Sequence, residues 1–134
     1  MTAPAPRVLP PVDDVNRGFW TAGASGKLQI QRCTSCSRWV FPPSATCPGC
    51  RGTTEYQAVS GKGRVFSYTV NHQPYNPAVP VPFVIAIVEL PEQDGVRFTT
   101  NIVNCPPADV RVGMPVHVLF EEDGGVFVPV FEPD

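Results

Sequence analysis

The chain has 134 residues, of which 43% are hydrophobic and only 16% are charged, and its formal net charge is −2. This length accommodates one ordinary domain, or a small barrel with a metal-held appendage, and excludes two large cores. The composition excludes a disordered tail, and the low charge content suggests that a partner covers some of the surface. Seventeen prolines and eleven glycines without a repeat favour strands and turns, so we expect a mainly β protein.

The first twelve residues are rich in proline and predict an extended arm. They lack the apolar region of a secretion signal, and the chain has no run of about 18 apolar residues that would predict a membrane span. We therefore expect a cytoplasmic protein without a membrane segment. Asp13 or Asp14 is then a candidate N-cap for one short helix, in which Val15, Phe19 and Ala22 follow helical spacing.

Phe19 and Trp20 give this helix an aromatic face wider than the helix itself requires. The face either packs against the rest of the chain or contacts a partner, and the sequence leaves both possibilities open. Residues 1–26 are thus interpreted as an N-terminal arm and a short helix.

Two Cys-x-x-Cys units follow a strand expected at residues 28–31. Cys33 and Cys36 form the first unit, and Cys47 and Cys50 form the second after ten intervening residues. A two-residue spacer lets both sulfurs of a unit reach the same ion, and four thiolates suit tetrahedral zinc. In a reducing compartment such pairs are metal ligands more often than disulfides. Iron in a rubredoxin-like site and a redox pair of cysteines are the alternatives.

We expect one structural Zn²⁺, because four protein sulfurs leave no position for water or substrate. A returning strand at residues 56–60 completes a zinc ribbon over residues 27–60. Trp39 and Phe41 lie between the two cysteine units, where they form either a contact surface or the ribbon's own small core. The fifth cysteine, Cys105, falls in an apolar, strand-like run and is expected to be a buried and inert thiol.

Five candidate strands follow the turn at residues 61–63, and they cover residues 64–71, 83–90, 96–104, 116–121 and 126–131. The segment 83–88 is apolar without alternation, as expected of the most buried strand. Five short antiparallel strands with a long first loop favour an OB-fold barrel over residues 61–134, with an SH3-like barrel as the alternative.

Charge is distributed unevenly along the chain. From Lys27 to Arg64 there are six bases and one acid, whereas from Glu89 to Asp134 there are nine acids and two bases. The first segment can attract an anion, and the second repels a polyanion.

Several motifs carry a family resemblance over nearly the whole chain, and they occur in the order Phe19-Trp20, Gln31-Arg32-Cys33, Phe41-Pro42-Pro43, Cys47-Pro48-Gly49-Cys50, Ser67-Tyr68-Thr69-Val70 and Val112-Gly113-Met114-Pro115. With them the sequence resembles the zinc-ribbon plus OB-fold family known as domain of unknown function thirty-five. Ser37 and Arg51 depart from the pattern, because a glycine often follows the second cysteine of each unit.

The resemblance implies an accessory subunit that handles acyl-CoA and leaves catalysis to its partner. That partner is either a thiolase-fold enzyme, such as a lipid-transfer-protein-type aldolase of steroid or lipid side-chain degradation or an acyltransferase, or a hot-dog-fold enoyl-CoA hydratase. Arginines can pair with CoA phosphates and an aromatic ring can stack on adenine. The candidate CoA contacts are Arg38, Trp39, Phe41, Arg51, Lys62 and Arg64. The candidate partner interface is Phe19, Trp20 and Tyr75.

Two other functions are weighed against this one. A single-stranded nucleic-acid binder would stack bases on Phe66, Tyr68 or Tyr75, but an isoelectric point near 5.6 argues against it. An independent enzyme would need a base such as His72, and no motif places a nucleophile beside it. His117 lies in an expected strand on the face opposite its apolar neighbours and is given no role.

Overall fold

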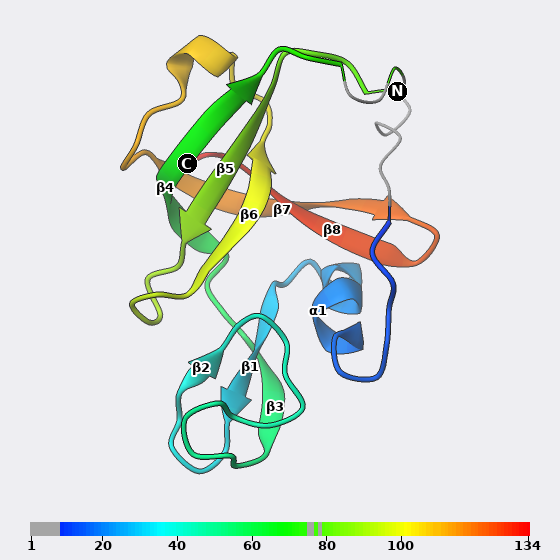
Figure 1. Cartoon of the computed structure of the whole chain (residues 1–134), viewed down its shortest axis with the longest axis vertical. Helices are drawn as coiled ribbons and strands as arrows, with labels where there is room; N and C mark the ends of the chain where they lie inside the picture. Colours follow the sequence, from blue (N-terminus) through cyan, green and yellow to red (C-terminus); the bar gives the residue numbers. More distant parts are fainter. Residues whose placement is uncertain (1–8, 75–76, 78) are drawn as a thin grey trace.

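The computed structural model describes residues 9–74, 77 and 79–134. The described chain forms a three-stranded sheet, a closed five-stranded barrel and one short helix that lies beside both (Figure 1). The predicted class, mainly β with a ribbon and a barrel, is confirmed. Tyr75, predicted as a partner or stacking residue, lies outside the described residues. The helical segments that the structure describes are too short to cross a membrane.

The helix is shorter than its sequence pattern suggests. α1 spans Arg17–Thr21 and continues as a 3-10 helix, Ala22–Ser25. Oδ1 of Asp13 accepts hydrogen bonds from the amides of Val15 (2.9 Å) and Asn16 (2.8 Å), so this aspartate caps the turn that leads into the helix. The N-cap residue itself is Asn16.

The ribbon sheet has the strand order β2-β1-β3 and is antiparallel, with β1 at Gln29–Cys33, β2 at Trp39–Val40 and β3 at Thr54–Ala58. Buried Gln31 holds the loop that carries the second cysteine unit. Its side chain accepts from the Ser44 amide at 2.7 Å and donates to the Ser44 carbonyl at 2.8 Å, as a neighbouring strand would.

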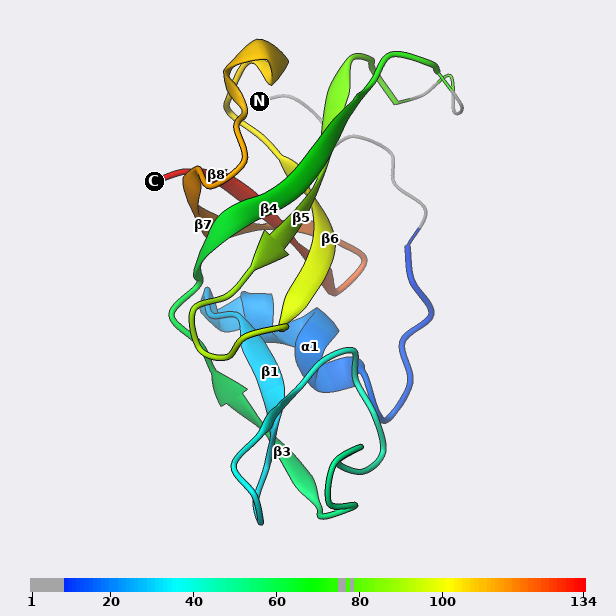
Figure 2. The same cartoon turned by 60° about the vertical axis from the view of Figure 1, so that its left-hand side comes forward.

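The barrel strands are β4 (Lys62–Asn71), β5 (Phe83–Glu89), β6 (Arg97–Ile102), β7 (Pro115–Asp123) and β8 (Val126–Pro133), with a 3-10 turn, η2, at Pro107–Asp109. Their order around the barrel is β4-β5-β6-β8-β7. All neighbours are antiparallel except β6 and β8, which run parallel (Figure 2). The strand ends differ from the predicted ends by two residues or fewer.

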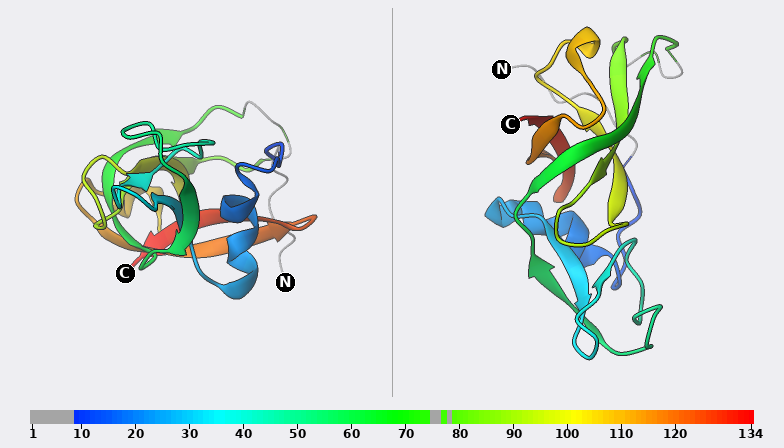
Figure 3. Two further views of the ribbon diagram at one scale, coloured as in Figure 1. Left: turned by 90° about the horizontal axis from the view of Figure 1, so that it is seen from below. Right: turned by 90° about the vertical axis from the view of Figure 1, so that its left-hand side faces the viewer.

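Ribbon, helix and barrel share one hydrophobic core. Phe98 of β6 lies at its centre, with its ring centroid 6.2 Å from that of Phe19, 5.2 Å from Phe41 and 5.6 Å from Phe131. Trp39 belongs to the same core and is 9% exposed. Trp39 and Phe41 therefore pack on the barrel, and the ribbon extends from one end of it (Figure 3).

Two neighbouring residues of the β5–β6 loop fasten the ribbon to the barrel. The side chain of Gln93 accepts from the Trp39 amide (2.9 Å) and donates to the Trp39 carbonyl (3.0 Å). Oε2 of Glu92 accepts from the amide of Ser60 at 2.8 Å, in the segment between β3 and β4. These bonds and the shared core fix the orientation of the ribbon.

Candidate metal centre

The four predicted cysteines converge on one point. Their sulfur atoms all lie within 4.8 Å of one another, with Cys33 and Cys50 3.4 Å apart and Cys36 and Cys47 3.8 Å apart. Four sulfurs at roughly 2.3 Å from a tetrahedral ion would be about 3.8 Å from one another, so the cluster fits a single metal ion. β1 ends and β3 begins at this site, at the end of the ribbon away from the barrel (Figure 1).

Both cysteine units fold in the same way. The amide of Ser37 donates to the Cys33 carbonyl (3.1 Å), and the amide of Arg51 donates to the Cys47 carbonyl (2.8 Å). Ser37 and Arg51 have φ of 64° and 62°, the left-handed conformation that glycine adopts without strain. The strain of about 1–2 kcal/mol per residue is small beside the roughly 10–16 kcal/mol of metal binding in zinc peptides.

Backbone amides stabilise thiolate charge at this site. The amides of Cys36 and Ser35 both lie 3.4 Å from Sγ of Cys33, and these bonds, that of Cys36 first, lower the pKa of Cys33 to about 6. The amide of Cys50 likewise lowers the pKa of Cys47. For Cys50 the amide of Gly52 acts in the same direction, but bonds to the neighbouring sulfurs prevail and raise its pKa to about 11. A metal ion must therefore displace a proton from the cluster.

Gly52 lies directly against the sulfur cluster. A Cβ atom at this position would lie 2.9 Å from Oγ of Ser35, 3.0 Å from Sγ of Cys33 and 3.2 Å from Sγ of Cys50. A larger residue would therefore crowd the hydroxyl of Ser35 and two of the ligand sulfurs. Four protein sulfurs around one ion leave no position for a substrate, so this centre can support the fold but cannot activate a reactant.

The six predicted CoA contacts do not gather in one place. Arg38 and Arg51 are exposed on the cysteine units, where Arg38 lies against Gly49. Trp39 is buried under the guanidinium of Arg32, whose central carbon is 4.7 Å from the ring centroid, so its ring offers little surface for stacking. Phe41 is half-buried in the core. Lys62 and Arg64 lie on β4, in the barrel.

The predicted partner residues of α1 also turn inward. Phe19 is buried in the shared core, and Trp20 packs against it with its ring edge-on at 4.8 Å. The sequence left two interpretations of this aromatic face open, and packing within the chain explains the burial of Phe19. A partner contact stays a prediction for Trp20, and for Tyr75, which lies outside the described residues. Cys105 lies in the loop after β6 and not in a strand, and its thiol is half-buried.

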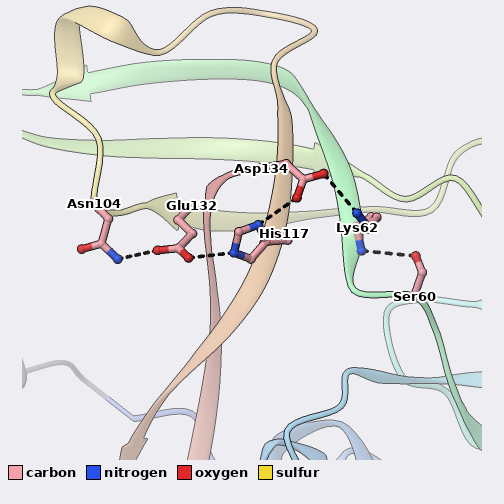
Figure 4. A network of polar contacts seen from close by, with 6 residues as sticks. All are labelled: Ser60, Lys62, Asn104, His117, Glu132 and Asp134. Carbon is pink, nitrogen blue, oxygen red and sulfur yellow. Dashed lines mark hydrogen bonds and ion pairs between the residues drawn. The ribbon is translucent and has the colours of Figure 1, made fainter.

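A second group of polar side chains lies where the barrel closes (Figure 4), and of its members only Lys62 has a role predicted from the sequence. His117 of β7 is 2.7 Å from Oε2 of Glu132 through Nε2 and 3.1 Å from Oδ1 of Asp134 through Nδ1. Asn104 donates to Oε1 of Glu132 (2.6 Å), and Lys62 pairs with Oδ2 of Asp134 (3.2 Å). Only the protonated imidazolium can donate to both carboxylates.

The hairpin register could have revealed this pair. Gly124 and Gly125 form the turn between β7 and β8 with φ of 58° and 85°, so residues at equal distance on either side of the turn face each other. His117 and Glu132 are such a pair. The contact between Gln93 and Trp39, in contrast, has no local signal.

Comparison with known proteins matches both parts of the chain. The model described as "ChsH2, rubredoxin-like zinc ribbon domain" matches residues 20–56, and "ChsH2, C-terminal OB-fold domain" matches residues 56–121. The second match selects the OB fold over the SH3-like alternative.

Three relatives show how far the similarity extends. A "DUF35 domain-containing scaffold protein" of Methanocaldococcus jannaschii is 44% identical over 69% of each chain. A "Probable enoyl-CoA hydratase alpha subunit" of Thermomonospora curvata is 40% identical over 98% of this chain, which spans only 42% of that subunit. A chain of the solved "Ltp2-ChsH2(DUF35) aldolase" is 37% identical with a TM-score of 0.84, covering 93% of this chain and 98% of its own length. The chain therefore belongs to the DUF35/ChsH2 family, whose members combine a zinc ribbon with an OB-fold domain.

Proposed function

We propose that the protein is a non-catalytic accessory subunit that holds one structural Zn²⁺ and supports a thiolase-like enzyme acting on acyl-CoA. This proposal rests mainly on the similarity to a chain solved as part of the Ltp2-ChsH2(DUF35) aldolase. The two chains are 37% identical, and the match covers 98% of the solved chain. The closed set of four sulfurs supports the non-catalytic role, because it offers no open coordination position.

The fixed orientation of the ribbon suits a scaffold. The shared core and the bonds from Gln93 and Glu92 hold ribbon and barrel as one body. A partner that contacts both parts then loses little conformational freedom on binding. The metal would hold the far end of the ribbon, where β1 ends and β3 begins.

The test is reconstitution with the Ltp2 component of the solved aldolase. The purified chain is mixed with Ltp2, and the molar mass of the complex is measured by light scattering during gel filtration, followed by aldolase activity with and without the chain. We expect a stable complex and activity that depends on it. Two separate peaks and unchanged activity contradict the proposal.

A second candidate is an accessory subunit of an enoyl-CoA hydratase, favoured by the 40% identity with a subunit of that name. The same gel-filtration assay with the beta subunit of that hydratase discriminates the two. The same proposal makes three further predictions. They are CoA contact by exposed Arg38 and Arg51, substrates with steroid or lipid side chains, and a cytoplasmic location. Calorimetry with an acyl-CoA, on the chain and on the complex, tests the first of them.

A further inference from the structure

Strand β5 is apolar on both of its faces, but the described chain covers only one. Val84, Ala86 and Val88 point into the barrel and are almost fully buried. On the other side Ile85 is half-buried and Ile87 is 37% exposed. The sequence predicts that this strand is the most buried one, and among the described residues that is wrong for its outer face. A strand without polar alternation is typical of one that is covered on both sides.

The strands on either side extend this uncovered surface. Ser67 and Thr99 lie directly across from Ile87, and Thr69 lies across from Ile85. Residues directly opposite in a sheet share a face. The register shift between Val65 and Ser67 adds Phe66, which is 45% exposed. We call this surface the outer patch, and it comprises Phe66, Ser67, Thr69, Ile85, Ile87 and Thr99.

The outer patch is uncharged, and one row of charges borders it. Arg64, Glu89 and Arg97 lie side by side across β4, β5 and β6. Arg97 pairs with Glu89 at 2.8 Å, and its guanidinium carbon lies 3.9 Å from the ring centroid of Phe66. An uncharged centre with a charged rim is the usual composition of a protein–protein interface. A base-stacking surface would need a free ring, and one face of Phe66 is already occupied.

We propose that the outer patch is the docking surface for the thiolase-like partner enzyme, an inference that rests on the proposed function. The rim carries two arginines against one glutamate, so a second copy of the chain would meet it with the same excess of positive charge. The complementary surface is an enzyme face with an apolar centre and carboxylates at its edge. A partner there would cover the outer face of β5 and complete the burial that its sequence predicts.

The test compares two charge-introducing variants at exposed apolar positions. Ile87→Glu places a carboxylate in the outer patch, and Val112→Glu does the same at a residue that is 68% exposed and lies between η2 and β7. The Ltp2 component of the solved aldolase is the probe, and binding is measured by calorimetry. Thr99→Arg is a second variant of the patch at an exposed polar position, and thermal unfolding confirms that every variant is folded.

We expect Ile87→Glu and Thr99→Arg to weaken binding of Ltp2 at least tenfold and Val112→Glu to leave it within a factor of two to three. If the unchanged chain binds Ltp2 and the folded patch variants bind equally well, the docking surface is elsewhere and the proposed function stands. If the unchanged chain does not bind, the proposed function fails first. Two other results would assign the patch to another occupant and overturn the inference. In one, Ile87→Glu dissociates a homodimer; in the other, it abolishes oligonucleotide binding while Ltp2 binding persists.

Discussion

Nε2 of His117 on β7 lies 2.7 Å from Oε2 of Glu132 on β8, directly across the hairpin that ends the described chain. The other ring nitrogen faces Asp134, which in turn pairs with Lys62 of β4. The imidazole of His117, through Asp134, thus links the end of β8 to β4, the first strand of the barrel (Figure 4). Charged side chains therefore lie at the closure of the barrel, beside the backbone pairing of β4 with β7.

We predict that acid weakens this closure. Asn104, followed by His117, holds the pKa of Glu132 below its ordinary 4.5, and Lys62, followed by His117, holds that of Asp134 below 3.8. A carboxylate with a lower pKa in the folded state stabilises the fold above its ordinary pKa and loses this effect as the pH falls through the lowered value. The free energy of unfolding should therefore decrease as the pH falls below about 4.5, and Glu132→Gln should make that decrease smaller.

Urea titrations between about pH 6 and about pH 3.5 measure this effect. Acid also protonates thiolates and releases bound metal, so each variant is compared with the unchanged protein at the same pH. Glu122→Gln, at an exposed residue of the same hairpin, is the control and should leave the decrease unchanged. Equal pH dependence of Glu132→Gln and the unchanged protein would contradict the prediction.

Replacing Gln93 should loosen the ribbon from the barrel. Gln93→Ala leaves the amide and carbonyl of buried Trp39 without these partners. The loss should be about 1–3 kcal/mol of unfolding free energy, with faster hydrogen exchange at the Trp39 amide. Gln57→Ala removes only an exposed bond to Glu55 and should change stability by less than about 0.5 kcal/mol. Unchanged exchange at Trp39 would show that Gln93 does not hold it.

Two glycines next to the cysteines should respond differently to one added methyl group. A Cβ at Gly52 would lie 3.0 Å from Sγ of Cys33, whereas a Cβ at Gly49 would have no neighbour closer than 3.7 Å. Gly52→Ala should therefore lower zinc affinity about tenfold or more, equivalent to about 1.4 kcal/mol, and Gly49→Ala should change it little. Competition with a chromophoric chelator measures both affinities. Equal zinc affinities of Gly52→Ala and the unchanged protein would mean that the sulfurs can shift to accommodate the methyl group without loss of binding free energy, and would contradict the prediction.

Phe98→Ala should be among the most destabilising single changes. Its ring joins Phe19 of the helix, Phe41 of the ribbon and Phe131 of the barrel. Removing a buried ring of this size costs about 3–5 kcal/mol, and here the loss should appear in the ribbon as well as in the barrel. Exposed Val112→Ala is the control. If the ribbon kept its hydrogen-exchange protection in Phe98→Ala, the shared core would not couple the two parts.

Local sequence signals predicted the elements well. The two Cys-x-x-Cys units predicted the cluster of four sulfurs, and turn residues bounded the five barrel strands to within two residues. The left-handed conformation of Ser37 and Arg51 was indicated by the family resemblance, because a glycine often follows the second cysteine of each unit.

Contacts between distant segments could not be predicted in the same way. The sequence shows two aromatic residues, Trp39 and Phe41, between the cysteine units. The contacts that bury them come from a barrel strand and from Gln93, which is 54 residues away from Trp39. The continuous apolar run of β5 indicated burial without showing that the described part of the chain leaves the second face uncovered.

A structural role for the ribbon requires that four sulfurs close the coordination of one metal ion. X-ray absorption at the zinc edge, combined with metal analysis of the reduced protein, measures that coordination. We expect one zinc ion per chain with four sulfur neighbours at about 2.3 Å and no lighter ligand. An oxygen or nitrogen in the first coordination shell, or a protein that folds without bound metal, would contradict that role.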